Sequence, residues 1–167
     1  VVYYTDWVSE PLQGLRDAII RALQSVLPED LAAELARDEL GSVLQVGSLF
    51  VPTPLVLILD QFEEFFRYQR RGASFQPFIE QLTAIILDKS LPVNIVLSMR
   101  EDFALELNAF KPRLPTLLFM NFYRLERLDR AGARRAIETP VKQLGYAYEA
   151  ALLEQLLDDL LRVQSGR

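Results

Sequence analysis

Two patterns of apolar positions run along the chain: short continuous runs and residues at helical spacing. The continuous, β-branched or aromatic runs predict strands at residues 1–5, 55–59 and 93–99. The run at 55–59 is bounded by prolines and is typical of a parallel strand covered on both faces. The segment "NFYRLERL", residues 121–128, predicts a further, weaker strand.

Helical spacing predicts five helices between these strands and after them. Ser9 is the expected N-cap of the first helix, which Pro28 ends, and Gly41 is expected to end the second. Asp129 is the expected cap of the fourth. The predicted helices cover residues 10–27, 29–40, 75–86, 130–140 and 152–161. Strands that alternate with helices indicate βαβ units, so the fold class is α/β with a parallel sheet. A boundary is predicted near residue 128, with α/β structure before it and helices after it.

The composition indicates a globular protein with a substantial core. Of the 167 residues, 50% are apolar and 25% are charged, and the net charge is −5. An acidic chain does not favour nucleic acid as a partner. One basic strip, from Lys111 to Arg135, runs against this balance. We interpret it as a solvated face, with a phosphate or protein contact as the alternative.

The residue types that are missing restrict the chemistry. The chain contains no cysteine and no histidine, which excludes disulfides, thiolate or histidine metal sites and Ser-His-Asp triads. Chemistry here depends on carboxylates, lysine and arginine, hydroxyls, backbone amides or a bound hard cation. No apolar run approaches the ~20 residues that cross a bilayer. We therefore expect a soluble, cytoplasmic protein, and one that begins in the interior of a longer chain, since Val1 is not preceded by methionine.

Two charged residues follow directly on predicted buried strands, Asp60 after residues 55–59 and Arg100 after residues 93–99. Ligands of open parallel sheets bind beyond the carboxyl ends of the strands. A carboxylate at such a position needs a cationic partner. Arg100 could form a structural ion pair with it. Alternatively, Asp60 orders a Mg²⁺ ion in a Walker B arrangement, and a glutamate a few residues later orients or deprotonates an attacking water.

The segment "LVLILDQFEEFF" resembles the Walker B segment of STAND-type P-loop NTPases, specifically the bacterial group called novel STAND, which is related to the AP-ATPase and NACHT groups. Three more stretches agree in order and spacing. "NIVLSMREDF" resembles the strand that supplies the family's sensor arginine, and "FYRLERLDRAGARRAIETPV" resembles the entry into the helical lid. "VVYYTDWVSEPLQGLRDAI" resembles the strand and helix that follow the phosphate-binding helix. The resemblance covers nearly the whole chain.

The resemblance implies a parallel-sheet P-loop NTPase core of the ASCE or AAA+-like type over residues 1–128, lacking the P-loop strand, and the start of a helical lid over 129–167. ATP or ADP with Mg²⁺ are the implied cofactors. Asp60 would order the Mg²⁺, and Glu64, with Glu63 as the second candidate, would position or activate water. Arg100 would sense the terminal phosphate, and Pro140 would pack against the adenine.

Each of these residues also has a structural interpretation. Glu63 and Glu64 could be a solvated helix start, favoured by the helix dipole. Asp102 is expected to be an N-cap rather than a ligand. Pro140 could simply interrupt a helix.

The chain departs from the family in one respect. The phosphate-binding motif G-x-x-x-x-G-K-[ST] is absent from it. In the family its strand lies beside the strand that ends in the sensor arginine, so we expect the motif upstream of Val1. Without the motif, the chain alone is expected to bind ATP weakly or not at all and to be inactive.

The family implies a nucleotide-controlled signalling switch, in which ATP opens the lid and permits homo-oligomerisation, and slow hydrolysis resets it. Effector and sensor domains, often with WD repeats, would flank the module, and no membrane or nucleic acid partner is expected. A non-catalytic interaction module with the same fold is the alternative. A carboxylate-based glycosidase is a second one, but it needs exposed aromatics around a sugar cleft. The chain has a single tryptophan, and most of its phenylalanines lie at core spacing.

Overall fold

The computed structural model describes residues 1–115 and 120–164. Three strands form one parallel sheet with β2 in the centre, in the order β1-β2-β3. Their bounds are Val2–Tyr4 for β1, Leu55–Leu59 for β2 and Val93–Leu97 for β3. The register places Tyr3 opposite Ile58, and Ile58 opposite Val96. The strand predictions at 1–5, 55–59 and 93–99 are confirmed.

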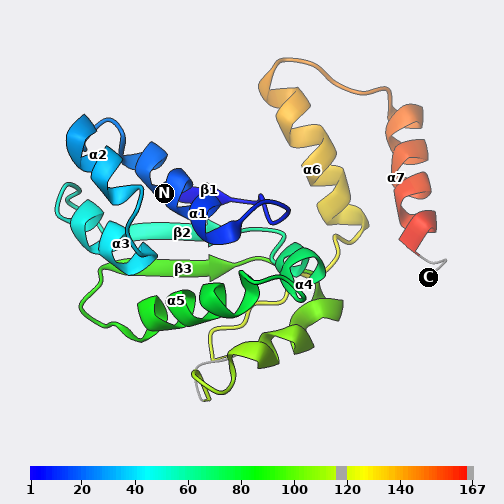
Figure 1. Cartoon of the computed structure of the whole chain (residues 1–167). Helices are drawn as coiled ribbons and strands as arrows, with labels where there is room; N and C mark the ends of the chain where they lie inside the picture. Colours follow the sequence, from blue (N-terminus) through cyan, green and yellow to red (C-terminus); the bar gives the residue numbers. More distant parts are fainter. Residues whose placement is uncertain (116–119, 165–167) are drawn as a thin grey trace. The chain divides into compact units, whose positions relative to one another are not determined.

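Helices make up most of the remaining described chain (Figure 1). They are α1 (Pro11–Leu23), α2 (Glu29–Leu35), α3 (Leu40–Ser48), α4 (Glu63–Gln69), α5 (Phe75–Leu87), the 3₁₀ helix η1 (Glu101–Phe110), α6 (Arg130–Gln143) and α7 (Ala150–Gln164). The predicted helices at 75–86, 130–140 and 152–161 correspond to α5, α6 and α7. Asp129 caps α6 as predicted, since its carboxylate accepts the Gly132 N–H at 2.6 Å.

Two helix predictions are wrong in detail. The cap of α1 is Glu10 rather than Ser9, because the Glu10 carboxylate reaches the backbone N–H of Gln13 at 2.6 Å. The single helix predicted at 29–40 is two helices, and Gly41 lies in the first turn of α3 instead of ending α2. The N–H of Leu40, at the start of α3, donates to the Gln81 side chain of α5 at 3.0 Å. This contact between distant segments supports a helix start that local spacing does not indicate.

The strand predicted at residues 121–128 is also wrong. The structure assigns neither strand nor helix there, and Tyr123 and Leu125 are exposed. A strand requires a neighbour that accepts and donates its backbone hydrogen bonds. Among the described strands, none pairs with this segment. An apolar, β-branched pattern is therefore not sufficient.

One face of the sheet is buried beneath helices. Leu55, Leu57 and Leu59 of β2 belong to a single core with side chains of α1, α3 and α5, and these helices lie close to the strands in Figure 1. On the opposite face Val56 and Ile58 are only half-buried, and Val96 is exposed. The prediction that residues 55–59 are covered on both faces therefore does not hold for the described part of the chain. We call this second side, with Tyr3, Val56, Ile58, Asp60, Asn94, Val96 and Ser98, the open face.

Trp7 lies at the centre of the core, with no exposed surface. Its ring meets four others edge-on, at centroid distances of 4.9 Å to Tyr4, 5.1 Å to Phe62, 5.7 Å to Phe78 and 5.8 Å to Phe65. Edge-to-face pairs of this kind add to the free energy of area burial. This aromatic cluster joins the segment after β1 to α4 and α5.

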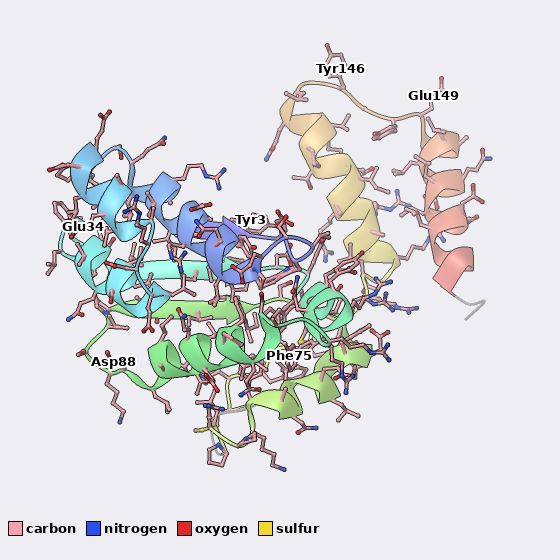
Figure 2. All side chains as sticks on the ribbon, in the orientation of Figure 1. Tyr3, Glu34, Phe75, Asp88, Tyr146 and Glu149 are labelled. Carbon is pink, nitrogen blue, oxygen red and sulfur yellow. The ribbon has the colours of Figure 1, made fainter. Side chains whose placement is uncertain are left out.

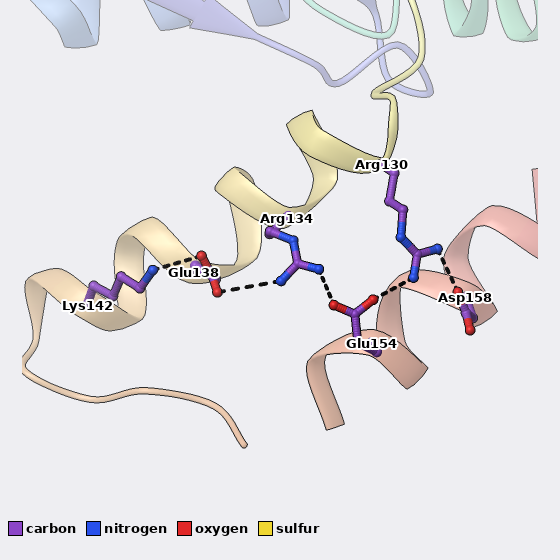
Figure 3. Close-up of polar contacts among 6 residues, drawn as sticks. All are labelled: Arg130, Arg134, Glu138, Lys142, Glu154 and Asp158. Atoms are coloured by element: carbon purple, nitrogen blue, oxygen red, sulfur yellow. Dashed lines mark hydrogen bonds and ion pairs between the residues drawn. The ribbon is translucent and has the colours of Figure 1, made fainter. Parts of the chain in front are cut away.

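A second compact unit spans Phe122–Arg167, separate from Val1–Asn121. Its α6 and α7 share a small core of Ala133, Leu153 and Leu157. An ion-pair network spans the two helices (Figure 3), in which Arg130 bonds to Glu154 and Asp158, each at 2.6 Å, and Arg134 bonds to Glu154. The division predicted at residue 128, into a core and the start of a lid, stays a prediction. Within the described residues, no helix is both long and apolar enough to span a bilayer.

Candidate functional site

Asp60 directly follows β2, and hydrogen bonds fix both its backbone and its side chain. Its N–H donates to the Tyr4 carbonyl at 3.0 Å, and its own carbonyl accepts the Trp7 indole N–H at 2.7 Å. The Tyr3 hydroxyl donates to Oδ2 of Asp60 at 2.5 Å. Hydrogen bonds from the hydroxyls of Ser98 and then of Tyr3 hold the pKa of the Asp60 carboxyl below its usual range. The side chain is therefore an oriented carboxylate on the open face.

The residue after Asp60 has an unusual backbone conformation. Gln61 has a φ of 52°, in the left-handed region that residues other than glycine rarely occupy. Phe62 then returns to the core, and its N–H donates to the carbonyl of Ser98 at 2.9 Å. This turn ends β2 and starts α4 at Glu63. Backbone strain of this kind is often found at functional sites.

The two glutamates at the start of α4 have different surroundings. Glu63 is only 7% exposed, and its Oε2 accepts the backbone N–H of Arg100 at 3.3 Å. Glu64 is partly exposed and forms an ion pair with Arg67 at 2.6 Å. The interpretation of both residues as a solvated helix start therefore fails for Glu63. The buried carboxylate of Glu63 links the start of α4 to the end of β3.

Arg100 follows β3, and its side chain is 62% exposed. Its guanidinium binds both carboxylate oxygens of Asp102, at 3.1 and 2.7 Å, and lies over the ring of Phe103 at 5.7 Å. In the described residues it forms no ion pair with Asp60 or Glu64, as the structural interpretation required. Asp102 lies in the first turn of η1 and is not its N-cap, so the capping prediction is wrong. Arg100 itself occupies the cap position.

The remaining predicted features lie farther along the chain. Pro140 lies inside α6 with an exposed side chain, so it does not interrupt that helix. The two units are not placed relative to one another, and the adenine contact of Pro140 stays a prediction. Several arginines of the basic strip pair with carboxylates, such as Arg113 with Glu80 at 2.6 Å. Such pairing is typical of a solvated, ion-paired surface.

The donor set around Asp60 fits Mg²⁺ better than a cation held wholly by the protein. Among the described residues, no group of three or more acidic side chains could enclose a metal ion. Mg²⁺ keeps several waters and binds one or two carboxylates together with substrate phosphates. A single anionic carboxylate, oriented by Tyr3 and Ser98 at the end of a strand, matches that preference.

Sequence reasoning did not identify Tyr3 or Ser98. Ser98 pairs in register with Asp60, since Leu59 lies opposite Leu97. A polar residue next to the end of a predicted buried strand was the available signal for it. Tyr3 lies 57 residues from Asp60 in the chain, and only the register of β1 against β2 reveals the contact (Figure 2).

Comparison with known protein families gave one match. The family model described as Novel STAND NTPase 1 matches residues 5–166. No curated protein and no solved structure matches the chain. The matched region includes Asp60, Glu63, Glu64 and Arg100.

Proposed function

The chain belongs to the Novel STAND NTPase 1 family, and we propose that it carries the magnesium and sensor half of the nucleotide site of a signalling switch. Residues 1–128 would form that part of an ATP-binding core, and residues 129–167 would begin a lid. One observation carries the proposal. Asp60, Glu63, Glu64 and Arg100 gather at the carboxyl ends of two adjacent parallel strands, where ligands of such sheets bind.

The surroundings of each side chain suit a different role. Asp60 would hold the Mg²⁺ of the nucleotide, whose chemistry is to neutralise charge that develops on the phosphates. Glu64 is partly exposed, and only an ion pair with the exposed Arg67 restrains it. Such a pair contributes roughly 1 kcal/mol or less, so the Glu64 carboxylate can turn towards a water. Glu63 is buried against the Arg100 backbone, which suits a supporting role better than proton transfer.

The geometry of Arg100 favours a sensor over a structural partner. Its ion pair with Asp102 is exposed on both sides, with 62% and 57% of the two side chains accessible. A guanidinium held in this way can exchange its partner for a phosphate at little cost, and charge-assisted bonds to phosphate are among the stronger hydrogen bonds. We propose that the terminal phosphate of ATP replaces Asp102 as its partner.

A P-loop elsewhere in a longer protein would complete the site. The sequence lacks G-x-x-x-x-G-K-[ST], whose amides and lysine supply much of the phosphate affinity. The family resemblance puts the P-loop strand beside the strand that ends in the sensor arginine. In the described part of the chain, the edge of β3 away from β2 pairs with no strand. That free edge is consistent with the missing strand, and we call the longer form with its P-loop the extended protein.

The proposed biological role follows from the family. Exchange of ADP for ATP would move the lid, permit oligomerisation and signal to flanking effector and sensor domains. Pro140, on the exposed surface of α6, would contact the adenine, and slow hydrolysis would reset the switch.

Arg100→Ala tests the sensor role. In the extended protein we expect ATP affinity to fall by ~10–100-fold, since a charge-assisted hydrogen bond contributes ~1.5–3 kcal/mol. ADP affinity should change by less than about twofold, because ADP lacks the phosphate that Arg100 senses. Calorimetric titration with each nucleotide measures both, and the melting temperature should change little because the side chain is exposed.

Arg70→Ala is the matched control. Arg70 is 63% exposed and forms a similar ion pair, with Glu106 at 2.9 Å. It should leave both affinities unchanged. Equal losses of ATP and ADP affinity in Arg100→Ala, with a large fall in melting temperature, would contradict the sensor role. No nucleotide binding by the extended protein would favour the non-catalytic interaction module.

A further inference from the structure

Tyr3 lies on the open face of the sheet with its hydroxyl on the Asp60 carboxylate. We infer that Tyr3 is a positioning residue, which holds the Asp60 carboxylate in the orientation that Mg²⁺ requires. The inference rests on the proposed function, since it gives Asp60 the metal. Tyr3 itself would touch neither the metal nor the nucleotide.

The register of the sheet explains how Tyr3 reaches Asp60. Tyr3 lies directly opposite Ile58, so Asp60 is two residues farther along the neighbouring strand on the same face. Long aromatic side chains span such diagonal positions. The tyrosine hydroxyl therefore arrives at Asp60 from β1, while the Ser98 hydroxyl arrives from the end of β3.

These contacts leave Asp60 little freedom. Its backbone is fixed on both sides, by the Tyr4 carbonyl and by the Trp7 indole. The two hydroxyls then fix the carboxylate itself. Groups that hydrogen-bond to a metal ligand set its direction, and their loss typically lowers metal affinity by ~10–100-fold. A carboxylate oriented before the cation arrives loses less conformational freedom when it binds.

Tyr3 is a poor candidate for a purely structural residue. Its side chain is 60% exposed and lies outside the core, whereas its neighbour Tyr4 is 5% exposed and belongs to the core. Apart from its ring, which lies on the open face, its specific contact is the bond to Asp60. Removal of the hydroxyl should therefore change Asp60 without unfolding the chain.

The test is Tyr3→Phe in the extended protein, with ADP and ATP binding measured by calorimetry across a series of Mg²⁺ concentrations. We expect the Mg²⁺ concentration for half-maximal enhancement of nucleotide binding to rise about tenfold. Nucleotide binding in the presence of EDTA and the melting temperature should both match the parent protein. Tyr68→Phe is the control, since Tyr68 is a similarly exposed tyrosine of α4, and it should behave as the parent.

Two results with Tyr3→Phe would overturn the inference. An unchanged or lower Mg²⁺ requirement would mean that the hydroxyl is irrelevant or competes with the metal. Equal weakening with and without Mg²⁺ would mean that Tyr3 supports the fold in general. Asp60→Asn, measured alongside, separates these results from failure of the proposed function. If Asp60→Asn keeps the Mg²⁺ dependence of the parent, Asp60 is not the metal residue and the inference falls with that role.

Discussion

Trp7→Ala is expected to destabilise the core by ~3–5 kcal/mol, the typical cost of truncating a buried aromatic side chain. The side chain is fully buried and meets four aromatic rings, so alanine leaves a large cavity among them. The substitution also removes the indole N–H that the Asp60 carbonyl accepts. Since domains of this size have a total stability of ~5–15 kcal/mol, a large share of it should be lost.

Urea denaturation followed by circular dichroism measures this effect, because Trp7 is the only tryptophan and its fluorescence disappears with it. Trp7→Phe should fall between the parent and Trp7→Ala, since it fills part of the cavity and lacks the N–H. The exposed Tyr68 offers a control, and Tyr68→Ala should change stability by about 0.5 kcal/mol or less. A cost below about 1 kcal/mol for Trp7→Ala would show that the aromatic cluster does not centre on this residue.

Glu64→Gln is expected to slow ATP hydrolysis by the extended protein at least ~100-fold, the usual contribution of a general base. Glutamine keeps the shape of the side chain but cannot accept the proton of the attacking water. Nucleotide affinity should remain close to that of the parent, because the proposed role of Glu64 concerns the water and not the phosphates. Phosphate release under saturating Mg-ATP measures turnover, and calorimetry measures affinity.

Glu63→Gln is the matched variant on the adjacent residue. Its amide oxygen can still accept the Arg100 N–H, so the link between α4 and β3 should survive and turnover should stay within about tenfold of the parent. If Glu63→Gln stops turnover and Glu64→Gln does not, the two assignments are reversed. That outcome would make the buried carboxylate the base.

The sequence predicts those parts of the fold that are determined locally. The strands at 55–59 and 93–99 are continuous apolar runs, and α5 has clean helical spacing, so both were predictable. The start of α3 depends on Gln81 of α5, and the start of η1 lies against the buried Glu63. Contacts between segments this far apart leave no periodic signal. The opposite error occurred at 121–128, where a strand-like pattern has no partner strand in the described chain.

The candidate site was predictable in its residue types and less so in its contacts. Asp60 and Arg100 were identifiable because each follows an apolar run, which places it at the carboxyl end of a parallel strand. Whether these two residues form an ion pair was not predictable, and the structure pairs Arg100 with Asp102 instead. The hydroxyls that orient Asp60 come from β1 and from the end of β3, and only the strand register shows that they converge.

The Mg²⁺ dependence of ATP binding in Asp60→Asn tests the central claim most directly. Asparagine can still accept the hydrogen bonds of Tyr3 and Ser98 but cannot offer a negative oxygen to the metal, so the fold should be retained. In the extended protein, calorimetry should show that Mg²⁺ strengthens ATP binding at least tenfold less in this variant than in the parent. The same Mg²⁺ enhancement in both proteins would contradict the account, because Asp60 would then not be the residue that holds the metal of a nucleotide site.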